Sequence, residues 1–270
     1  MGGSQSAARA AAAHTNDSDG GDLVERASDA FAETAMVVGS HRIRLLSLPD
    51  VPESDSFQTG HDLTGLVRWP CSSLVAGLLL RRGALANDTD VLDVGCGTGV
   101  AGIAAAVVCS PRRVVLADRQ PRCRELAAKN ARLQDAVGCI IDVEAYGWGT
   151  GDPRPPERGA FGLVIACECL YTAFDEMRSF EKYGARFHDG QALARFVDML
   201  DWCVAPRGVA LIAFDVRNAL DQERTLGALA AGGFGETEVL TAPECATHLR
   251  KSARLGALAQ SAVVVCATRS

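Results

Sequence analysis

The sequence predicts an α/β fold in which helices cover both faces of a mostly parallel sheet. Short apolar segments of strand length alternate with longer segments of helical length between residues 91 and 231. Residues 161–167 (Phe-Gly-Leu-Val-Ile-Ala-Cys) form a continuous apolar run, which is typical of a strand buried on both faces of a parallel sheet. A chain of 270 residues is long enough to build one such domain around an ample core.

The predicted elements can be placed in order along the chain. Residues 1–22, rich in Ala, Ser, Gly and Asp, are expected to form a disordered tail, and residues 23–270 a single domain. Residues 23–34 have the pattern of a short amphipathic helix, and a β-hairpin at about 35–48 turns at Gly39 and Ser40. The sheet strands are expected at 91–94, 113–117, 137–143, 161–167, 208–214, 236–240 and 262–267, and the helices at 71–83, 100 to about 110, 120–134, 191–204 and 220–231.

The composition favours an intracellular protein that does not bind nucleic acid. Lys and Arg number 27 against 33 Asp and Glu, so the formal net charge is −6, whereas a nucleic-acid binder usually presents a basic face. The ten cysteines are scattered among apolar residues, which is typical of reduced, buried thiols. Cys167 and Cys169 have the wrong spacing for a zinc pair, so no metal site is expected.

Two features concern membranes. No apolar run is long enough to span a bilayer, so a cytoplasmic location is expected. Residues 1–6 fit the M-G-x-x-x-[ST] pattern of N-myristoylation, which we interpret as a chance match in a tail of small residues. An acyl chain on Gly2 would give only weak membrane association, because no polybasic segment accompanies it.

A glycine-rich loop follows the first predicted sheet strand. Asp93 is followed by Gly95, Gly97 and Gly99 at alternate positions, and an Ala-rich segment comes next. Glycines allow a ligand to approach the backbone, and a helix start offers free N–H groups, so the loop indicates a nucleotide-type cofactor. Residues 97–102 also satisfy the G-x-G-x-x-G dinucleotide pattern. Asp93 favours S-adenosylmethionine, which has a cationic amino group, over a nicotinamide cofactor, whose pyrophosphate a carboxylate repels.

Polar and aromatic residues also follow the later strands. Asp118 ends the second sheet strand about 20 residues after the glycines, the offset at which a carboxylate accepts hydrogen bonds from ribose hydroxyls. Trp148 follows the third strand, and Glu168 and Tyr171 follow the fourth. Ligands of open α/β sheets bind beyond the carboxyl ends of the strands, so these side chains are expected to gather around one site.

Several motifs together resemble methyltransferase family 16, a group of seven-strand protein methyltransferases. In chain order they are Trp69-Pro70, the D-x-G-x-G-x-G loop that begins at Asp93, Asp118, Trp148-Gly149 and Glu168-x-x-Tyr171. The likeness covers about residues 35–268. It implies a Rossmann-like seven-strand sheet with an antiparallel last strand, S-adenosylmethionine as cofactor, and methyl transfer, mostly to a lysine side chain of a protein.

The loop and the resemblance together assign roles to residues. The cofactor contacts that they imply are Trp69, Asp93, Gly95, Cys96, Gly97, Gly99, Asp118, Trp148 and Cys167. By resemblance, Glu168 and Tyr171 are the catalytic residues and face the acceptor nitrogen. Two departures concern the substrate: the acidic residue of the last motif is more often Asp than Glu, and the stretch from 172 to 190 is longer than usual.

The predicted substrate is a lysine on a basic protein surface, and the enzyme is expected to be a monomer. Residues 172–190 are compatible both with a lid that recognises this surface and with a solvated insertion of no catalytic importance. Other acceptors stay open, namely a histidine, a protein N-terminus or a small molecule. Two other classes stay open as well, a nicotinamide-dependent oxidoreductase and a methyltransferase-like module that binds without turnover. Arg217, just beyond the fifth strand, is compatible both with binding a substrate carboxylate and with capping its neighbours.

Overall fold

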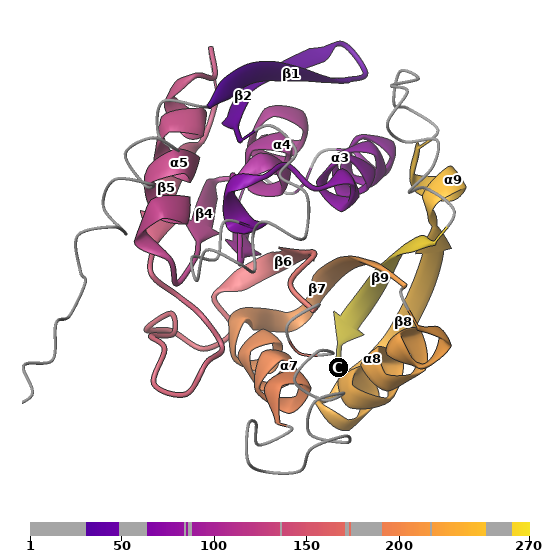
Figure 1. Ribbon diagram of the computed structural model, residues 1–270. Coiled ribbons are helices and arrows are strands. Elements are labelled where there is room, and N and C mark those ends of the chain that lie inside the picture. Colours follow the sequence, from indigo (N-terminus) through magenta and orange to yellow (C-terminus); the bar gives the residue numbers. More distant parts are fainter. Residues whose placement is uncertain are drawn as a thin grey trace, which may run out of the picture.

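A sheet of seven strands lies at the centre of the structure (Figure 1). The computed structural model describes residues 31–48, 64–83, 85, 88–135, 137–170, 173, 191–216, 218–246 and 261–270. The strand order across the sheet is β5-β4-β3-β6-β7-β9-β8. The strands are β3 (Asp90–Val94), β4 (Arg113–Ala117), β5 (Ile140–Glu144), β6 (Phe161–Cys167), β7 (Val204–Asp215), β8 (Phe234–Thr241) and β9 (Ala262–Arg269).

The strand directions confirm the predicted α/β class. β3 pairs in parallel with β4 and β6, and parallel pairing continues outward to β5 and β7. β9, the last strand in the chain, is antiparallel to both of its neighbours, β7 and β8. The chain order reverses between β3 and β6, because β4 and β5 extend the sheet to one side and β6 and β7 to the other. Open α/β sheets bind their ligands at such a switch point.

Helices form a layer on each face of the sheet (Figure 1). They are α3 (Pro70–Arg82), α4 (Val100–Cys109) and α5 (Pro121–Arg132) on one face and α7 (Ala192–Cys203) and α8 (Ala219–Ala231) on the other. Successive strand residues face opposite layers, so in β3 Val91 packs with α3 and α4 while Leu92 packs with α7. No helix among the described residues is long and apolar enough to cross a membrane.

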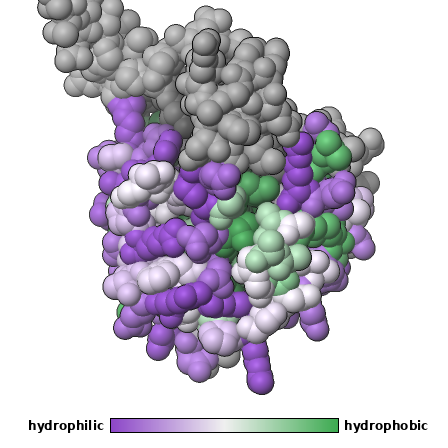
Figure 2. Space-filling view, turned by 90° about the horizontal axis from the view of Figure 1, so that it is seen from below, coloured by the Kyte–Doolittle hydropathy of each residue, from purple (hydrophilic) through white to green (hydrophobic). Residues whose placement is uncertain are grey.

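The layer of α7 and α8 presents its polar side to solvent. α7 buries Leu193, Phe196, Val197 and Leu200, which recur at helical spacing on one side. Figure 2 shows the molecule from below, the side on which these helices lie, and hydrophilic residues cover much of this face. The apolar side of α7 therefore faces the sheet, where it helps to enclose the second half of the core.

The predicted N-terminal hairpin is confirmed and packs against α4 and α5. β1 (Ala32–Val38) and β2 (His41–Ser47) pair antiparallel along their whole length. Val38, Ile43 and Leu45 are fully buried and join the core of the α3–α4 layer. The 3-10 helix η1 (Thr64–Leu66) is tied to the end of this hairpin, because the Leu48 N–H donates to the Leu66 carbonyl at 2.9 Å.

Several predicted boundaries are wrong. The helix expected at 23–34 is contradicted at residues 32–34, which belong to β1 because they pair with β2; residues 1–30 lie outside the described part of the chain. The third sheet strand begins at Ile140 rather than at 137, because the first residue of β4 lies opposite Ile140. β7 begins at Val204 rather than at 208, because Val204 pairs with the first residue of β6 before a bulge.

Candidate active site

The glycine loop joins β3 to α4 and takes a backbone conformation that favours glycine. Gly95 and Gly97 have φ of +66° and +52°, in the left-handed region that favours glycine. A Cβ on Gly97 would lie 2.7 Å from the Gly65 carbonyl oxygen, and one on Gly95 would lie 2.7 Å from the Cys169 sulfur. The Cys96 N–H donates to the Ala117 carbonyl at 2.9 Å, which holds the loop to the end of β4.

Gly102 explains why the sequence also satisfies the dinucleotide pattern. It lies in the first turn of α4, and a Cβ there would be 2.4 Å from the Leu116 side chain and 2.9 Å from the Cβ of Asp93. The third glycine of the pattern therefore serves close packing of the helix on the sheet, a requirement that does not depend on which cofactor is bound.

Asp118 clamps the glycine loop from the neighbouring strand. Its Oδ2 accepts the N–H of Gly97 at 3.0 Å, and its Oδ1 accepts the N–H of Gln120 at 2.8 Å. Burial raises the pKa of this carboxyl, and the two backbone hydrogen bonds oppose that shift. Each carboxylate oxygen accepts one of these bonds and has a second lone pair, so Asp118 can still accept from a diol in the cavity that it lines.

Asp93 is 1% exposed and lies beneath α4. Its Oδ2 accepts the N–H of Gly102 at 2.8 Å, at a helix start that favours negative charge. Its Oδ1 is buried and has no hydrogen-bond partner among the described residues. Burial raises the pKa of this carboxyl to about 7, the hydrogen bond from Gly102 opposes the shift, and the charge of Asp118 adds to it. A cation bound in the cavity would favour the ionised form.

Two tryptophans line the cavity, as expected from the sequence. The Trp69 indole N–H donates to the Thr64 carbonyl at 2.8 Å, which ties the start of α3 to η1. Trp148 packs edge-on against Phe196 of α7, with ring centroids 5.3 Å apart. Both side chains are thus held by contacts of their own and present flat, apolar walls.

Thiols make up another part of the wall. Cys96, Cys123, Cys167 and Cys169 all line the cavity. The Cys169 thiol lies 3.2 Å from the Val94 carbonyl and 3.3 Å from the Cys167 carbonyl, within hydrogen-bonding distance of both. Burial raises the pKa of the Cys96, Cys167 and Cys169 thiols well above the ordinary value, so they stay protonated and behave as small apolar groups.

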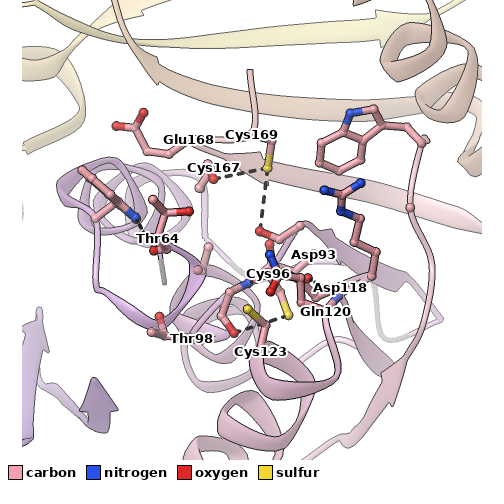
Figure 3. A pocket seen from close by; sticks show the side chains of 18 of the residues that line it. Thr64, Asp93, Cys96, Thr98, Asp118, Gln120, Cys123, Cys167, Glu168 and Cys169 are labelled. Carbon is pink, nitrogen blue, oxygen red and sulfur yellow. Dashed lines mark hydrogen bonds between the residues drawn. The ribbon is translucent and has the colours of Figure 1, made fainter. Parts of the chain in front are cut away.

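Glu168 lies where β6 ends and the chain turns. Its φ is +54°, a left-handed conformation that costs a non-glycine residue roughly 1–3 kcal/mol. The turn is held against β7, because the Glu168 N–H donates to the Ala213 carbonyl at 2.8 Å. Burial raises the pKa of the Cys71 thiol at the start of α3, and the nearby Glu168 carboxylate adds to this shift. In Figure 3 Glu168 lies at the opposite end of the cavity from Thr98 and Cys123.

These residues enclose one cavity of about 220 Å³ beyond the carboxyl ends of the central strands (Figure 3). Of the residues expected from the sequence, the cavity brings together Trp69, Asp93, Gly95, Cys96, Gly97, Asp118, Trp148, Cys167 and Glu168. Gly99 does not line it; this residue precedes α4, and a Cβ there would meet Ala127 and Leu116. Tyr171, Arg217 and residues 174–190 lie outside the described part of the chain.

The sequence did not indicate several residues of the cavity wall. They are Thr64, Gly65 and Val67 around η1, Ser72 in α3, Gln120 and Cys123 near the start of α5, Asp152 in the loop after β5, and Ala192 and Arg195 in α7. Asp152 had a usable signal, because it follows the Trp148-Gly149 motif by three residues and accepts the Gly149 N–H at 2.7 Å. The others come from distant segments without a motif.

The cavity suits S-adenosylmethionine in charge and shape. The unpartnered Oδ1 of Asp93 can pair with an ammonium group, and Asp118 can accept from ribose hydroxyls. A side chain on Gly95 would collide with Cys169 and come within 3.1 Å of Trp148, so the glycine keeps this part of the wall open. The carboxylates of Asp93 and Asp118 lie beside the loop, and they repel the pyrophosphate of a dinucleotide.

Comparison with known proteins shows where this chain has relatives. Residues 57–182 match a family described as lysine methyltransferase. The protein-lysine N-methyltransferase EEF2KMT of Mus musculus is 32% identical over 158 residues, which are 53% of this chain and 47% of that protein. The histone-arginine methyltransferase METTL23 of Xenopus laevis is 27% identical over 113 residues, which are 41% of this chain and 47% of that protein. The chain therefore spans about half the length of these relatives.

Proposed function

We propose that this chain methylates a lysine side chain of a protein, with S-adenosylmethionine as the methyl donor; the match of residues 57–182 to a lysine methyltransferase family supports this. One observation carries the proposal. The carboxylate of Glu168, on a strained turn after β6, lines the same cavity as the glycine loop and Asp118. An acidic group that can receive a cationic amine thus adjoins the proposed cofactor site.

Different residues of the cavity bind different parts of S-adenosylmethionine. Asp118 accepts from the ribose hydroxyls, Asp93 balances the amino group, and Trp69 and Trp148 supply flat apolar walls. The methyl group comes from a positively charged sulfur, and its transfer breaks a carbon–sulfur bond as a carbon–nitrogen bond forms. The described residues position the two reactants and exclude water, which are the main contributions that a protein can make to such a displacement.

Glu168 acts on the acceptor. A lysine amine with an ordinary pKa of about 10.4 is protonated at neutral pH and has no free electron pair. The Glu168 carboxylate pairs with the arriving ammonium and orients it, and the surrounding apolar wall of thiols and aromatic rings disfavours the charge, so one proton is released to solvent before transfer. Once neutral, the nitrogen is held by Glu168 with its electron pair toward the methyl group. Tyr171 is the second catalytic residue of this proposal and is expected to face the same nitrogen.

The test is Glu168→Gln, which keeps the side chain's size and removes its charge. We expect turnover to fall by about 100-fold or more, the range for loss of a positioned acid or base. The dissociation constant for S-adenosylmethionine should change less than about threefold, measured by calorimetry. Glu144→Gln is the matched control, because Glu144 ends the neighbouring strand β5 and is not part of the cavity lining. Unchanged turnover in Glu168→Gln would contradict the proposed role.

The acceptor is identified by labelling. The protein is incubated with S-adenosylmethionine that carries an isotope-labelled methyl group and with a cell lysate depleted of methylation, and labelled peptides are located by mass spectrometry. Label on lysine supports the proposal. Label on arginine, histidine or a protein N-terminus would replace lysine with that acceptor, and cofactor binding without transfer would indicate a non-catalytic module.

The proposal also covers the location of the enzyme, its oligomeric state and the kind of surface that it recognises. We place it in the cytoplasm, as a monomer whose substrate lysine lies on a basic protein surface, without a role for nucleic acid. The formal charge of −6 supports this choice, because an acidic protein attracts basic partners. Association of the substrate should weaken as salt is raised from about 0.05 to 0.5 M, measured as a rise in the KM for the protein substrate.

A further inference from the structure

We infer that Asn130 of α5, which joins the N-terminal hairpin to the cofactor loop, is a positioning residue for cofactor binding through its bond to the loop. The inference rests on the proposed function in that it takes the cavity to bind S-adenosylmethionine. It concerns a contact between three segments, namely β2, α5 and the loop after β3, which lie far apart in the sequence.

The Asn130 carboxamide is completely buried and uses both of its N–H groups. Its Oδ1 accepts the Leu46 N–H at 2.7 Å, and its Nδ2 donates to the Leu46 carbonyl at 2.9 Å and to the Thr98 carbonyl at 2.8 Å. Asn130 thus pairs with β2 as a residue of a neighbouring strand would, and its remaining N–H reaches the glycine loop.

Thr98 lies at the point of the loop where this contact matters for the cofactor. It stands between Gly97 and Gly99, is 5% exposed, and lines the cavity. Asp118 holds the N–H of Gly97 from one side, and Asn130 holds the carbonyl of Thr98 from another. The loop is therefore clamped at two successive residues. Its glycines are conformationally free, so these clamps limit the alternative shapes of the unbound loop.

Gln134, four residues after Asn130 and just beyond the end of α5, supplies a natural comparison. Its Nε2 donates to the Arg44 carbonyl at 2.7 Å and its Oε1 accepts the Arg44 N–H at 3.3 Å, so it repeats the pairing of Asn130 with β2. Its Nε2 also donates to the Asn130 carbonyl at 2.7 Å, at the end of α5. Gln134 thus holds the hairpin as Asn130 does, and the lining of the cavity does not include it.

Comparing the two residues separates hairpin docking from the bond to Thr98, because a substitution of Asn130 alone removes both. If hairpin docking alone supports the cofactor site, loss of either carboxamide should weaken cofactor binding alike. If the link to Thr98 supports it, only loss of the Asn130 carboxamide should do so. Asn130→Leu and Gln134→Met are suitable replacements, because each keeps the approximate volume of the side chain and removes its hydrogen bonds.

The experiment is titration of each full-length protein with S-adenosylmethionine in a calorimeter, together with the melting temperature without cofactor. We expect both variants to melt at lower temperature than the wild type. Asn130→Leu should bind the cofactor roughly tenfold more weakly, which is the loss of about one hydrogen bond, and Gln134→Met should bind within twofold of the wild type. Equal affinities in the two variants, whether weakened or unchanged, overturn the inference.

A second variant and a second readout cover the case in which Asn130→Leu does not fold. Asn130→Ser is smaller and keeps a hydroxyl, and it should show the same ordering of affinities. Hydrogen exchange of the loop amides without cofactor should be faster in the Asn130 variants and unchanged in Gln134→Met. If the wild type itself does not bind S-adenosylmethionine, the proposed function fails, and the exchange of the loop amides still decides whether Asn130 holds the loop.

Discussion

At the scale of single residues, Asp93 uses its two carboxylate oxygens differently. Oδ2 holds the first turn of α4 through the Gly102 N–H, and Oδ1 remains buried without a partner among the described residues. A buried polar atom without a partner costs free energy, so Asp93 is less stable ionised than it would be in water. This cost is what raises its pKa to about 7.

The shift predicts how stability depends on pH. The pKa is raised in the folded protein, so the native state binds the proton more tightly than the unfolded chain does. The resulting stabilisation is complete below the unfolded value of 3.8 and is lost as the pH rises through about 7. Without cofactor, the wild type should lose roughly 1 kcal/mol of unfolding free energy between about pH 6 and pH 8 relative to Asp93→Asn.

Urea titrations of both proteins across this pH range measure the difference. The Asn side chain keeps an acceptor for the Gly102 N–H but does not ionise, so the variant is matched in shape. Parallel stability curves for the wild type and the variant would falsify the assignment of this titration to Asp93.

At the scale of elements, α4 and α8 differ in how tightly neighbouring atoms pack against their glycines. A Cβ on Gly102 of α4 would lie 2.4 Å from Leu116, whereas a Cβ on Gly227 of α8 would meet nothing within 4 Å. The glycine in α4 is required by helix–sheet packing, because it lets the helix start lie close to β3 and β4. The glycine in α8 only lowers helix propensity.

Alanine at these two positions should therefore change stability in opposite directions. Gly102→Ala is expected to lower the free energy of unfolding by about 1–3 kcal/mol through overpacking. Gly227→Ala is expected to raise it by about 0.5–1 kcal/mol through helix propensity. Denaturant titrations of both variants measure the two effects, and stabilisation by Gly102→Ala would show that α4 can move away from Leu116 at no cost.

At the scale of the whole molecule, one cavity collects side chains from both helix layers. Trp69 and Ser72 come from the α3 side, and Ala192 and Arg195 come from α7 on the other face of the sheet. The cavity thus spans the switch point between β3 and β6, where the two halves of the sheet meet. A ligand bound there contacts elements from both halves and should stabilise the fold as a unit.

Thermal unfolding with added cofactor tests this expectation. S-adenosylmethionine at about 100 times its dissociation constant should add about 2.7 kcal/mol to the free energy of unfolding. For a domain of this size, that corresponds to a rise of roughly 5–10 °C in Tm. NAD at the same concentration is the control and should leave Tm unchanged; a larger shift with NAD would favour the oxidoreductase.

Much of the fold and part of the candidate site could be predicted because their signals are local. The segment from Asp93 to Gly99 contains its own strand end, turn and helix start, and the structure forms them as expected. Residues 57–182 match a family described as lysine methyltransferase, in agreement with the resemblance that the motifs indicate. The roles of the individual site residues stay predictions, including that of Tyr171, which lies outside the described residues.

Other parts depend on partners that no local pattern reveals. Residues 32–34 have a helical pattern and form a strand because β2 lies beside them. Asn130 reads as an ordinary polar residue of α5, yet it bonds to Leu46, 84 positions earlier. Gly65 becomes a wall of the site only because the Gly97 backbone passes within contact of it.

The sequence by itself therefore determined the order of strands and helices, the glycine loop, and the resemblance to a methyltransferase family. These follow from hydrophobic periodicity and from residues that are close together in the chain. Only the tertiary structure decided which distant segments complete the cavity, how Asp93 divides its two oxygens, and that Asn130 joins the hairpin to the loop. The physical reason is that burial and hydrogen bonding depend on what lies nearby in space, which the spacing of residues along the chain does not specify.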